Sequence, residues 1–252
     1  MVCYTGQLAL WLALFAPLGK AAPRPEIVIA AAANLTEAFR ALGPVFERET
    51  GVHPVFDFAS TAQLGQQIEY GAPFDVFAAA DSVHIDQLER KGLLVSGSRA
   101  VYAQGILALW IPAGATASVT RLEDLTAPQV RVIAIAKPEL APYGEAAVAA
   151  LTRAGIWDRV KPKIVYAENI NMARQYGASN NADAVFTAYS LVERSGGTVL
   201  RVDPALYPAI DQTLGILARA EHKDAARQFV NFLLHGNGRS ILARFGYKVP
   251  AR

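Results

Sequence analysis

The sequence has few of the residues that bind metals or nucleic acids. Its 252 residues include one Cys, four His and two Met, too few for the ligand clusters of a zinc, iron-sulfur or haem protein. The 24 Lys and Arg nearly balance the 22 Asp and Glu, and no basic run occurs of the kind that a phosphate backbone requires. No G-x-S-x-G or GK[ST] motif is present either. We therefore expect neither a nucleic-acid partner nor an enzyme.

Long apolar runs are also scarce, and the one that occurs opens the chain. Leu8 to Leu18 has the length of a signal-peptide core and is too short to span a bilayer. We predict a signal peptide over residues 1–21, cleaved after Ala21, and hence a periplasmic protein. Cys3 precedes the apolar run, so the mature chain would contain no Cys and no disulfide. The alternative, a buried N-terminal helix, is disfavoured by the prolines that follow.

After Pro25, short apolar runs alternate with amphipathic stretches, a pattern typical of parallel sheets with crossover helices. We predict an α/β protein of two lobes, each a mainly parallel sheet flanked by helices, with the ligand in the cleft between them. Residues 22–103 and 209–252 would form the first lobe, and residues 104–208 the second. The sequence shows no low-complexity linker between the lobes.

Four predicted junctions between a strand and a helix indicate a binding site: Ala33-Asn34, Ser60-Thr61, Pro142-Tyr143-Gly144 and Asn169-Ile170. Ligands of open α/β sheets bind at the carboxyl ends of strands, and helix N-termini there present N–H groups suited to anions. Each junction alone is explained by ordinary capping, and we expect Asn34 to be an N-cap. No Lys or Arg lies inside any of the junctions. Together they predict an anion site built from neutral dipoles.

The chain resembles the periplasmic molybdate-binding proteins, the solute-binding components of ABC-type molybdate importers. The stretches that carry the resemblance are VIAAAANLTEAF (28–39), FASTAQLGQQIEYGAPFDVFAAAD (58–81), KPELAPYGEAA (137–147) and AENINMARQYGASNNADAVFTAYS (167–190). It implies a type II periplasmic binding protein fold, a membrane permease as partner, a monomer and no cofactor. Molybdenum would be present only as the bound oxyanion, without direct protein ligands.

The resemblance also implies the site residues. The family's binding positions fall on Asn34, Thr61, Tyr143 and Ile170, with Ala33 and Ser60 beside them. Backbone N–H groups, the Asn34 amide and the Thr61 hydroxyl would donate to the oxyanion. Some relatives have Tyr where this chain has Thr187, so we leave Thr187 out and make Tyr143 the candidate for the missing hydroxyl.

A site that only donates hydrogen bonds suits a fully deprotonated oxyanion and disfavours protonated phosphate, which also needs an acceptor. Molybdate and tungstate fit this description, and so does sulfate. Two alternatives stay open: a binding protein for another anion such as sulfate, and an exported enzyme on the same scaffold. His84 and Asp86, which follow Asp81, are interpreted as a solvated helix face rather than as a metal site.

Overall fold

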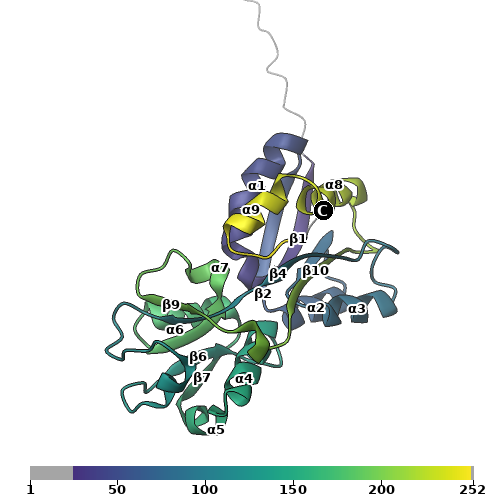
Figure 1. Cartoon of the computed structure of the whole chain (residues 1–252). Helices are drawn as coiled ribbons and strands as arrows, with labels where there is room; N and C mark the ends of the chain where they lie inside the picture. The colour runs from purple at the N-terminus through teal and green to yellow at the C-terminus, as the bar shows by residue number, and fades with distance from the viewer. Residues whose placement is uncertain (1–24, 251–252) are drawn as a thin grey trace, which may run out of the picture.

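The computed structural model describes residues 25–250, which form two five-stranded sheets covered by helices (Figure 1). The predicted signal peptide and its cleavage point lie outside this range. Within it, no helix has both the length and the apolar character needed to cross a bilayer.

The first sheet has the strand order β2-β1-β3-β10-β4. Only β10 runs against the other four strands. One helical layer contains α1, α8 and α9, and another contains α2 and α3 (Figure 1). The bounds are β1 (Glu26–Ala32), β2 (His53–Ala59), β3 (Val76–Ala79), β4 (Ala100–Gly105), β10 (Ile210–Ile216), the 3₁₀ turn η1 (Ala33–Leu35), α1 (Thr36–Thr50), α2 (Thr61–Glu69), α3 (Val83–Arg90), α8 (Lys223–Leu234) and α9 (Asn237–Arg244).

The second sheet has the order β7-β6-β8-β5-β9, and only β5 runs against the rest. Its elements all come from the middle of the chain. They are β5 (Leu107–Ile111), η2 (Leu122–Thr126), β6 (Ile133–Ala136), α4 (Pro142–Arg153), α5 (Trp157–Val160), η3 (Lys161–Lys163), β7 (Ile164–Ala167), α6 (Ile170–Ala178), β8 (Ala184–Ala188), α7 (Tyr189–Val192) and β9 (Thr198–Arg201).

Two crossovers join the sheets, one from β4 to β5 at Gly105 and one from β9 to β10 through η4 (Pro204–Leu206). Each crossover leads into the single reversed strand of the sheet that it enters. The predicted α/β class with two mainly parallel sheets is confirmed. The predicted lobe boundaries lie near these crossovers and stay a prediction.

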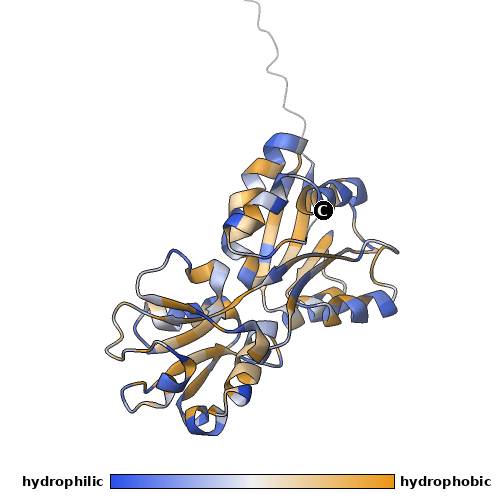
Figure 2. Cartoon of the chain, viewed as in Figure 1, coloured by the Kyte–Doolittle hydropathy of each residue, from blue (hydrophilic) through white to orange (hydrophobic). Residues whose placement is uncertain are grey.

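Apolar strands and amphipathic helices build the two cores, as the orange strands and blue outer helix faces of Figure 2 show. Phe39 and Phe46 of α1 pack edge-to-face on Phe229 of α8, with ring centroids 5.8 and 5.2 Å apart. This packing fixes α1, and hence the turn η1 that precedes it, against the first sheet.

Candidate functional site

Each lobe presents two helix starts at the carboxyl ends of neighbouring parallel strands. In the first lobe, β1 leads into η1 and β2 leads into α2, and the last residues of the two strands, Ala32 and Ala59, are paired in register. In the second lobe, β6 leads towards α4 and β7 towards α6, with Ala136 paired with Ala167. The four junctions identified in the sequence therefore form two adjacent pairs.

The backbone N–H groups of Asn34, Thr61, Tyr143 and Ile170 lie in the first turns of η1, α2, α4 and α6. First-turn N–H groups have no acceptor within their own helix. The four residues are only 1–3% exposed, and residues 25–250 supply no other backbone acceptor for these groups. Since buried N–H groups without an acceptor are rare in folded proteins, this arrangement is suited to a bound anion. We call these four N–H groups the candidate site.

Hydrogen bonds between the lobes bring the helix starts together. Asn171, the second residue of α6, donates from Nδ2 to the carbonyl oxygen of Ala33 (3.0 Å) and to Oγ1 of Thr36 (2.8 Å). The N–H of Ala62 in α2 donates to the carbonyl oxygen of Leu140, just before α4 (3.2 Å). The structure therefore places η1 beside α6 and α2 beside α4, with the lobes closed on each other.

The Asn34 side chain differs from both sequence-based expectations. It does not cap a helix, because η1 intervenes and α1 begins at Thr36 without a side-chain cap. Both of its amide hydrogens are used within the protein, since Nδ2 donates to Oε1 of Gln212 (2.7 Å) and to the hydroxyl of Tyr247 (2.9 Å). The Asn34 amide therefore fixes the turn, and the backbone N–H is the Asn34 donor that would be left for a ligand.

Thr61 and Ser60 use their hydroxyls differently. Oγ1 of Thr61 accepts a hydrogen bond from the N–H of Ala80 (3.2 Å), which leaves its own hydrogen free to donate. Ser60 directs its hydroxyl hydrogen at Oε1 of Gln63 (2.7 Å), so this hydroxyl fixes the start of α2. Ala33 contributes its carbonyl oxygen to the contact with Asn171. Of these three residues, only Thr61 has a side-chain donor available.

Two buried hydroxyls in the second lobe have no hydrogen-bond partner among the described residues, those of Tyr143 and Thr187. The Tyr143 ring extends from α4 towards Gly105, at the crossover, where a Cβ atom would collide with its hydroxyl. Burial raises the pKa of Tyr143 well above its usual value, so the hydroxyl keeps its proton. That the Tyr143 hydroxyl replaces the hydroxyl of the Tyr that some relatives have at position 187 stays a prediction.

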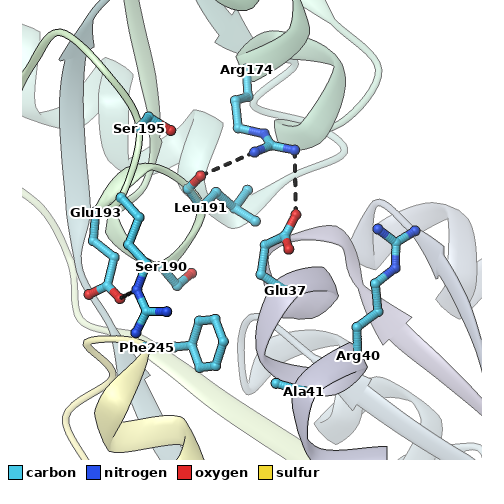
Figure 3. Close-up of a pocket in the computed structure, with 10 residues that line it drawn as sticks. Glu37, Arg40, Ala41, Arg174, Ser190, Leu191, Glu193, Ser195 and Phe245 are labelled. Carbon is cyan, nitrogen blue, oxygen red and sulfur yellow. Dashed lines mark hydrogen bonds and ion pairs between the residues drawn. The ribbon is translucent and has the colours of Figure 1, made fainter.

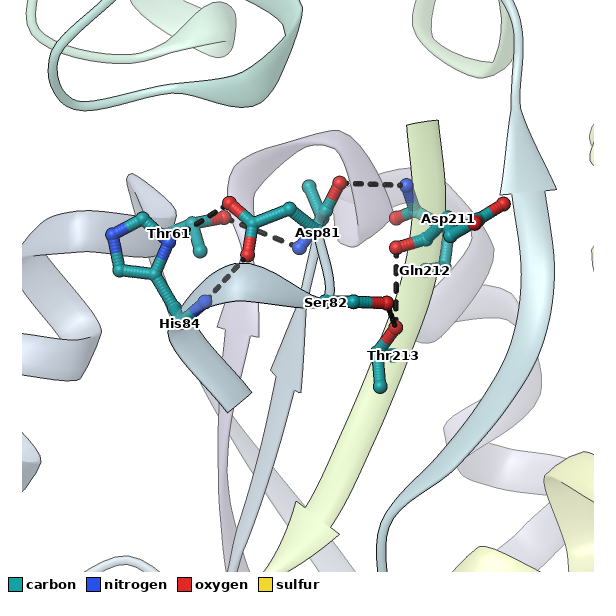
Figure 4. Close-up of polar contacts among 8 residues, drawn as sticks. Thr61, Asp81, Ser82, His84, Asp211, Gln212 and Thr213 are labelled. Carbon is teal, nitrogen blue, oxygen red and sulfur yellow. Dashed lines mark hydrogen bonds and ion pairs between the residues drawn. The ribbon is translucent and has the colours of Figure 1, made fainter. Parts of the chain in front are cut away.

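Two ion pairs lie near the candidate site. Lys137, after β6, forms an ion pair with Glu168, after β7. Asp81 accepts from Nδ1 of His84 through Oδ2 (2.8 Å), and Figure 4 shows this pair beside Thr61. No group of three or more potential metal ligands occurs within residues 25–250. Lys137 and His84, the two basic side chains of these pairs, are therefore each engaged by a carboxylate.

The Asp81–His84 pair predicts a pH dependence of stability. The hydrogen bond to Asp81 raises the pKa of His84 above its ordinary value of 6.5, helped by the nearby carboxylates of Glu145 and Glu69 and opposed by burial. A raised folded pKa stabilises the protein below the ordinary pKa, and this contribution is lost as pH rises through the folded value. Urea unfolding should show that His84→Gln costs more stability near pH 5.5 than near pH 8.5. Equal costs at both pH values would contradict the prediction.

A groove of about 510 Å³ marks the outer seam between the lobes. Figure 3 shows Glu37 of α1 reaching towards Arg174 of the second lobe, with Arg40 beyond Glu37 and Glu193 on the opposite side. Arg174 connects the two sides of the groove, because its Nη2 forms an ion pair with Oε1 of Glu37 (3.5 Å). Ser190 lines this groove and also donates to the carbonyl oxygen of Asn34 (3.2 Å), so one side chain connects the wall of the groove to the Asn34 turn.

Three residues beside the candidate site were not found from the sequence: Ser190, Gln212 and Tyr247. They surround Asn34, and all three are buried. Gln212 lies within β10, and Tyr247 follows α9 near the end of the described chain. Neither Gln212 nor Tyr247 stands at a strand-to-helix junction, so no local sequence pattern indicates that these two residues lie beside the site.

Comparisons with known proteins agree with this architecture. Residues 27–248 match the family model described as bacterial extracellular solute-binding protein. The chain is 33% identical to the molybdate-binding protein ModA of Rhodobacter capsulatus, covering 94% of this chain and 93% of that protein. It is 34% identical to ModA of Azotobacter vinelandii, covering 91% and 92% respectively.

Solved structures give the same result for the fold. The periplasmic molybdate-binding protein of Azotobacter vinelandii superposes with a TM-score of 0.85 at 29% identity, covering 89% of this chain and 100% of that one. The sulfate-binding protein SubI of Mycobacterium tuberculosis superposes with a TM-score of 0.77 at 16% identity, covering 89% of this chain and 87% of that one. The similarity to SubI is one of fold alone.

Proposed function

This chain belongs to the bacterial extracellular solute-binding protein family, and we infer that it is the molybdate-binding component of an ABC transporter. It is a binding protein rather than an enzyme, and it acts outside the cytoplasmic membrane. It would capture molybdate, and analogues of similar size such as tungstate, and deliver the anion to a membrane permease. Export by a signal peptide cleaved after Ala21 belongs to the same proposal.

The observation that supports this function best is the candidate site itself. Two N–H groups from each lobe, with the Thr61 hydroxyl, would donate to one anion. Charge-assisted hydrogen bonds contribute about 1.5–3 kcal/mol each, and helix N-termini add about 0.3–1 kcal/mol apiece. Several such donors together offset the large cost of removing a dianion from water. We propose Asn34, Thr61, Tyr143 and Ile170 as the residues that bind it.

Sulfate is the main alternative ligand, because it is also a fully deprotonated tetrahedral dianion. Its support here is a fold likeness at 16% identity, whereas the molybdate-binding relatives are 33–34% identical over nearly the whole chain. Calorimetric titration of the refolded, dialysed mature protein with molybdate, tungstate, sulfate and phosphate tests the choice. Tighter binding of sulfate than of molybdate would overturn it.

Ligand should also stabilise the protein strongly and selectively. At a molybdate concentration a thousandfold above Kd, linkage adds about 4 kcal/mol to the free energy of unfolding. For a chain of this size, that gain corresponds to an increase in Tm of roughly 8–16 °C. Differential scanning calorimetry with molybdate and with sulfate at equal concentration measures both shifts. We expect a much smaller shift with sulfate, and the reverse order would contradict the proposal.

A further inference from the structure

One buried hydroxyl contacts both lobes beside the candidate site. The Tyr247 hydroxyl donates to the carbonyl oxygen of Asn34 (2.8 Å) and accepts from Nδ2 of the same residue (2.9 Å). It also accepts from Oγ of Ser190 in α7 of the second lobe (3.1 Å). Ser190 shares its hydroxyl hydrogen with the Asn34 carbonyl oxygen (3.2 Å). Tyr247 thus holds Asn34 at two points and joins it to the opposite lobe.

The backbone around Tyr247 is attached to the strand that leads into the crossover. Lys248 pairs with Gln104 of β4 through two hydrogen bonds, Gln104 N–H to Lys248 O (2.7 Å) and Lys248 N–H to Gln104 O (2.9 Å). Gln104 directly precedes Gly105, where the chain passes to the second sheet. Tyr247 is therefore fixed to the first lobe at the point about which the second lobe would move.

We propose that Tyr247 is a positioning residue that orients the Asn34 turn for the oxyanion and stabilises the closed form through Ser190. This inference rests on the proposed function. The bonds to Asn34 lie within the first lobe and would persist in an open form, whereas the bond to Ser190 joins the lobes and would be lost on opening. Removal of the Tyr247 hydroxyl should therefore loosen the turn in the free protein and speed release of bound anion.

Tyr247→Phe is the direct test, because it keeps the ring and removes only the hydroxyl. Tyr102→Phe is a matched control. Tyr102 is also fully buried, in β4, but its hydroxyl has no hydrogen-bond partner among residues 25–250, so its removal should cost little. Stopped-flow fluorescence with molybdate should show dissociation at least about tenfold faster for Tyr247→Phe, equivalent to about 1.4 kcal/mol, and within about twofold of the parent for Tyr102→Phe.

Ser190→Ala tests the partner in the second lobe. If the two hydroxyls act together, Ser190→Ala should also speed dissociation, and the double variant with Tyr247→Phe should show less than the sum of the two effects. A purely structural role would instead lower the Tm of the free Tyr247→Phe protein and leave molybdate dissociation unchanged. That outcome would overturn the proposal.

A measurement without ligand separates this inference from the proposed function. Hydrogen exchange of the peptide covering residues 33–39 in the free protein should be faster in Tyr247→Phe than in the parent, and unchanged in Tyr102→Phe. If the parent fails to bind molybdate, the proposed function fails while the exchange result still tests the role of Tyr247. Unchanged exchange in Tyr247→Phe would contradict its positioning of the Asn34 turn.

Discussion

Asn34→Asp is expected to weaken molybdate binding at least about a thousandfold. A carboxylate about 4 Å from a bound charge, at an effective dielectric constant of about 20, repels it by about 4 kcal/mol for each unit of charge. The variant also loses the amide that donates to Gln212 and Tyr247, so the turn that presents the Asn34 N–H is no longer held on that side. Partial protonation of the new carboxyl would relieve some of this repulsion, and the thousandfold figure allows for that.

Calorimetric titration of Asn34→Asp with molybdate measures the loss, and circular dichroism at the same temperature shows whether the protein is folded. Asn181→Asp is a suitable control, because it makes the same change of charge at an exposed position of the second lobe. We expect its Kd to stay within about twofold of the parent, since exposed charges are strongly screened. A Kd for Asn34→Asp within tenfold of the parent would remove Asn34 from the proposed site.

The helix starts could be predicted from the sequence because their signals are local. Ser60 and Asn169 precede helices in the way that capping residues do, and Asn169 does accept from the N–H of Met172 (3.0 Å). Pro142 occupies the first position of α4, where a missing N–H costs nothing. The parallel strands before these helices then place their N-termini at one edge of each sheet.

The surroundings of Asn34 could not be predicted in the same way. Its side-chain acceptors, Gln212 and Tyr247, lie 178 and 213 residues further along the chain, and no local pattern connects positions so far apart. The expected N-cap was wrong for a related reason. The Asn34 side chain is fully buried between β10 and the C-terminal segment, where two acceptors replace the capping interaction that an isolated helix start would favour.

Gly144→Ala is expected to destabilise the protein and weaken binding together. Gly144 lies in the first turn of α4, where an added methyl group would overlap the carbonyl oxygen of Ala136 and lie 2.9 Å from its carbonyl carbon. Both are backbone atoms at the end of β6, so the start of α4 would have to move away from the sheet. Overpacking of this kind costs about 3 kcal/mol, which lowers Tm by roughly 6–12 °C.

The same displacement would carry the Tyr143 N–H away from the other three donors, and loss of one charge-assisted hydrogen bond weakens molybdate binding at least about tenfold.

Gly65→Ala in α2 is the matched control, because its methyl group would meet only Cδ2 of His84 at an ordinary 3.5 Å. Alanine is favoured over glycine inside a helix by about 1 kcal/mol, so Gly65→Ala should raise Tm by roughly 2–4 °C and leave Kd unchanged. Calorimetry of the two variants should therefore give shifts of opposite sign. If Gly144→Ala melted at or above the parent temperature, α4 would not approach β6 as closely as described, and the position of the Tyr143 N–H would have to be revised.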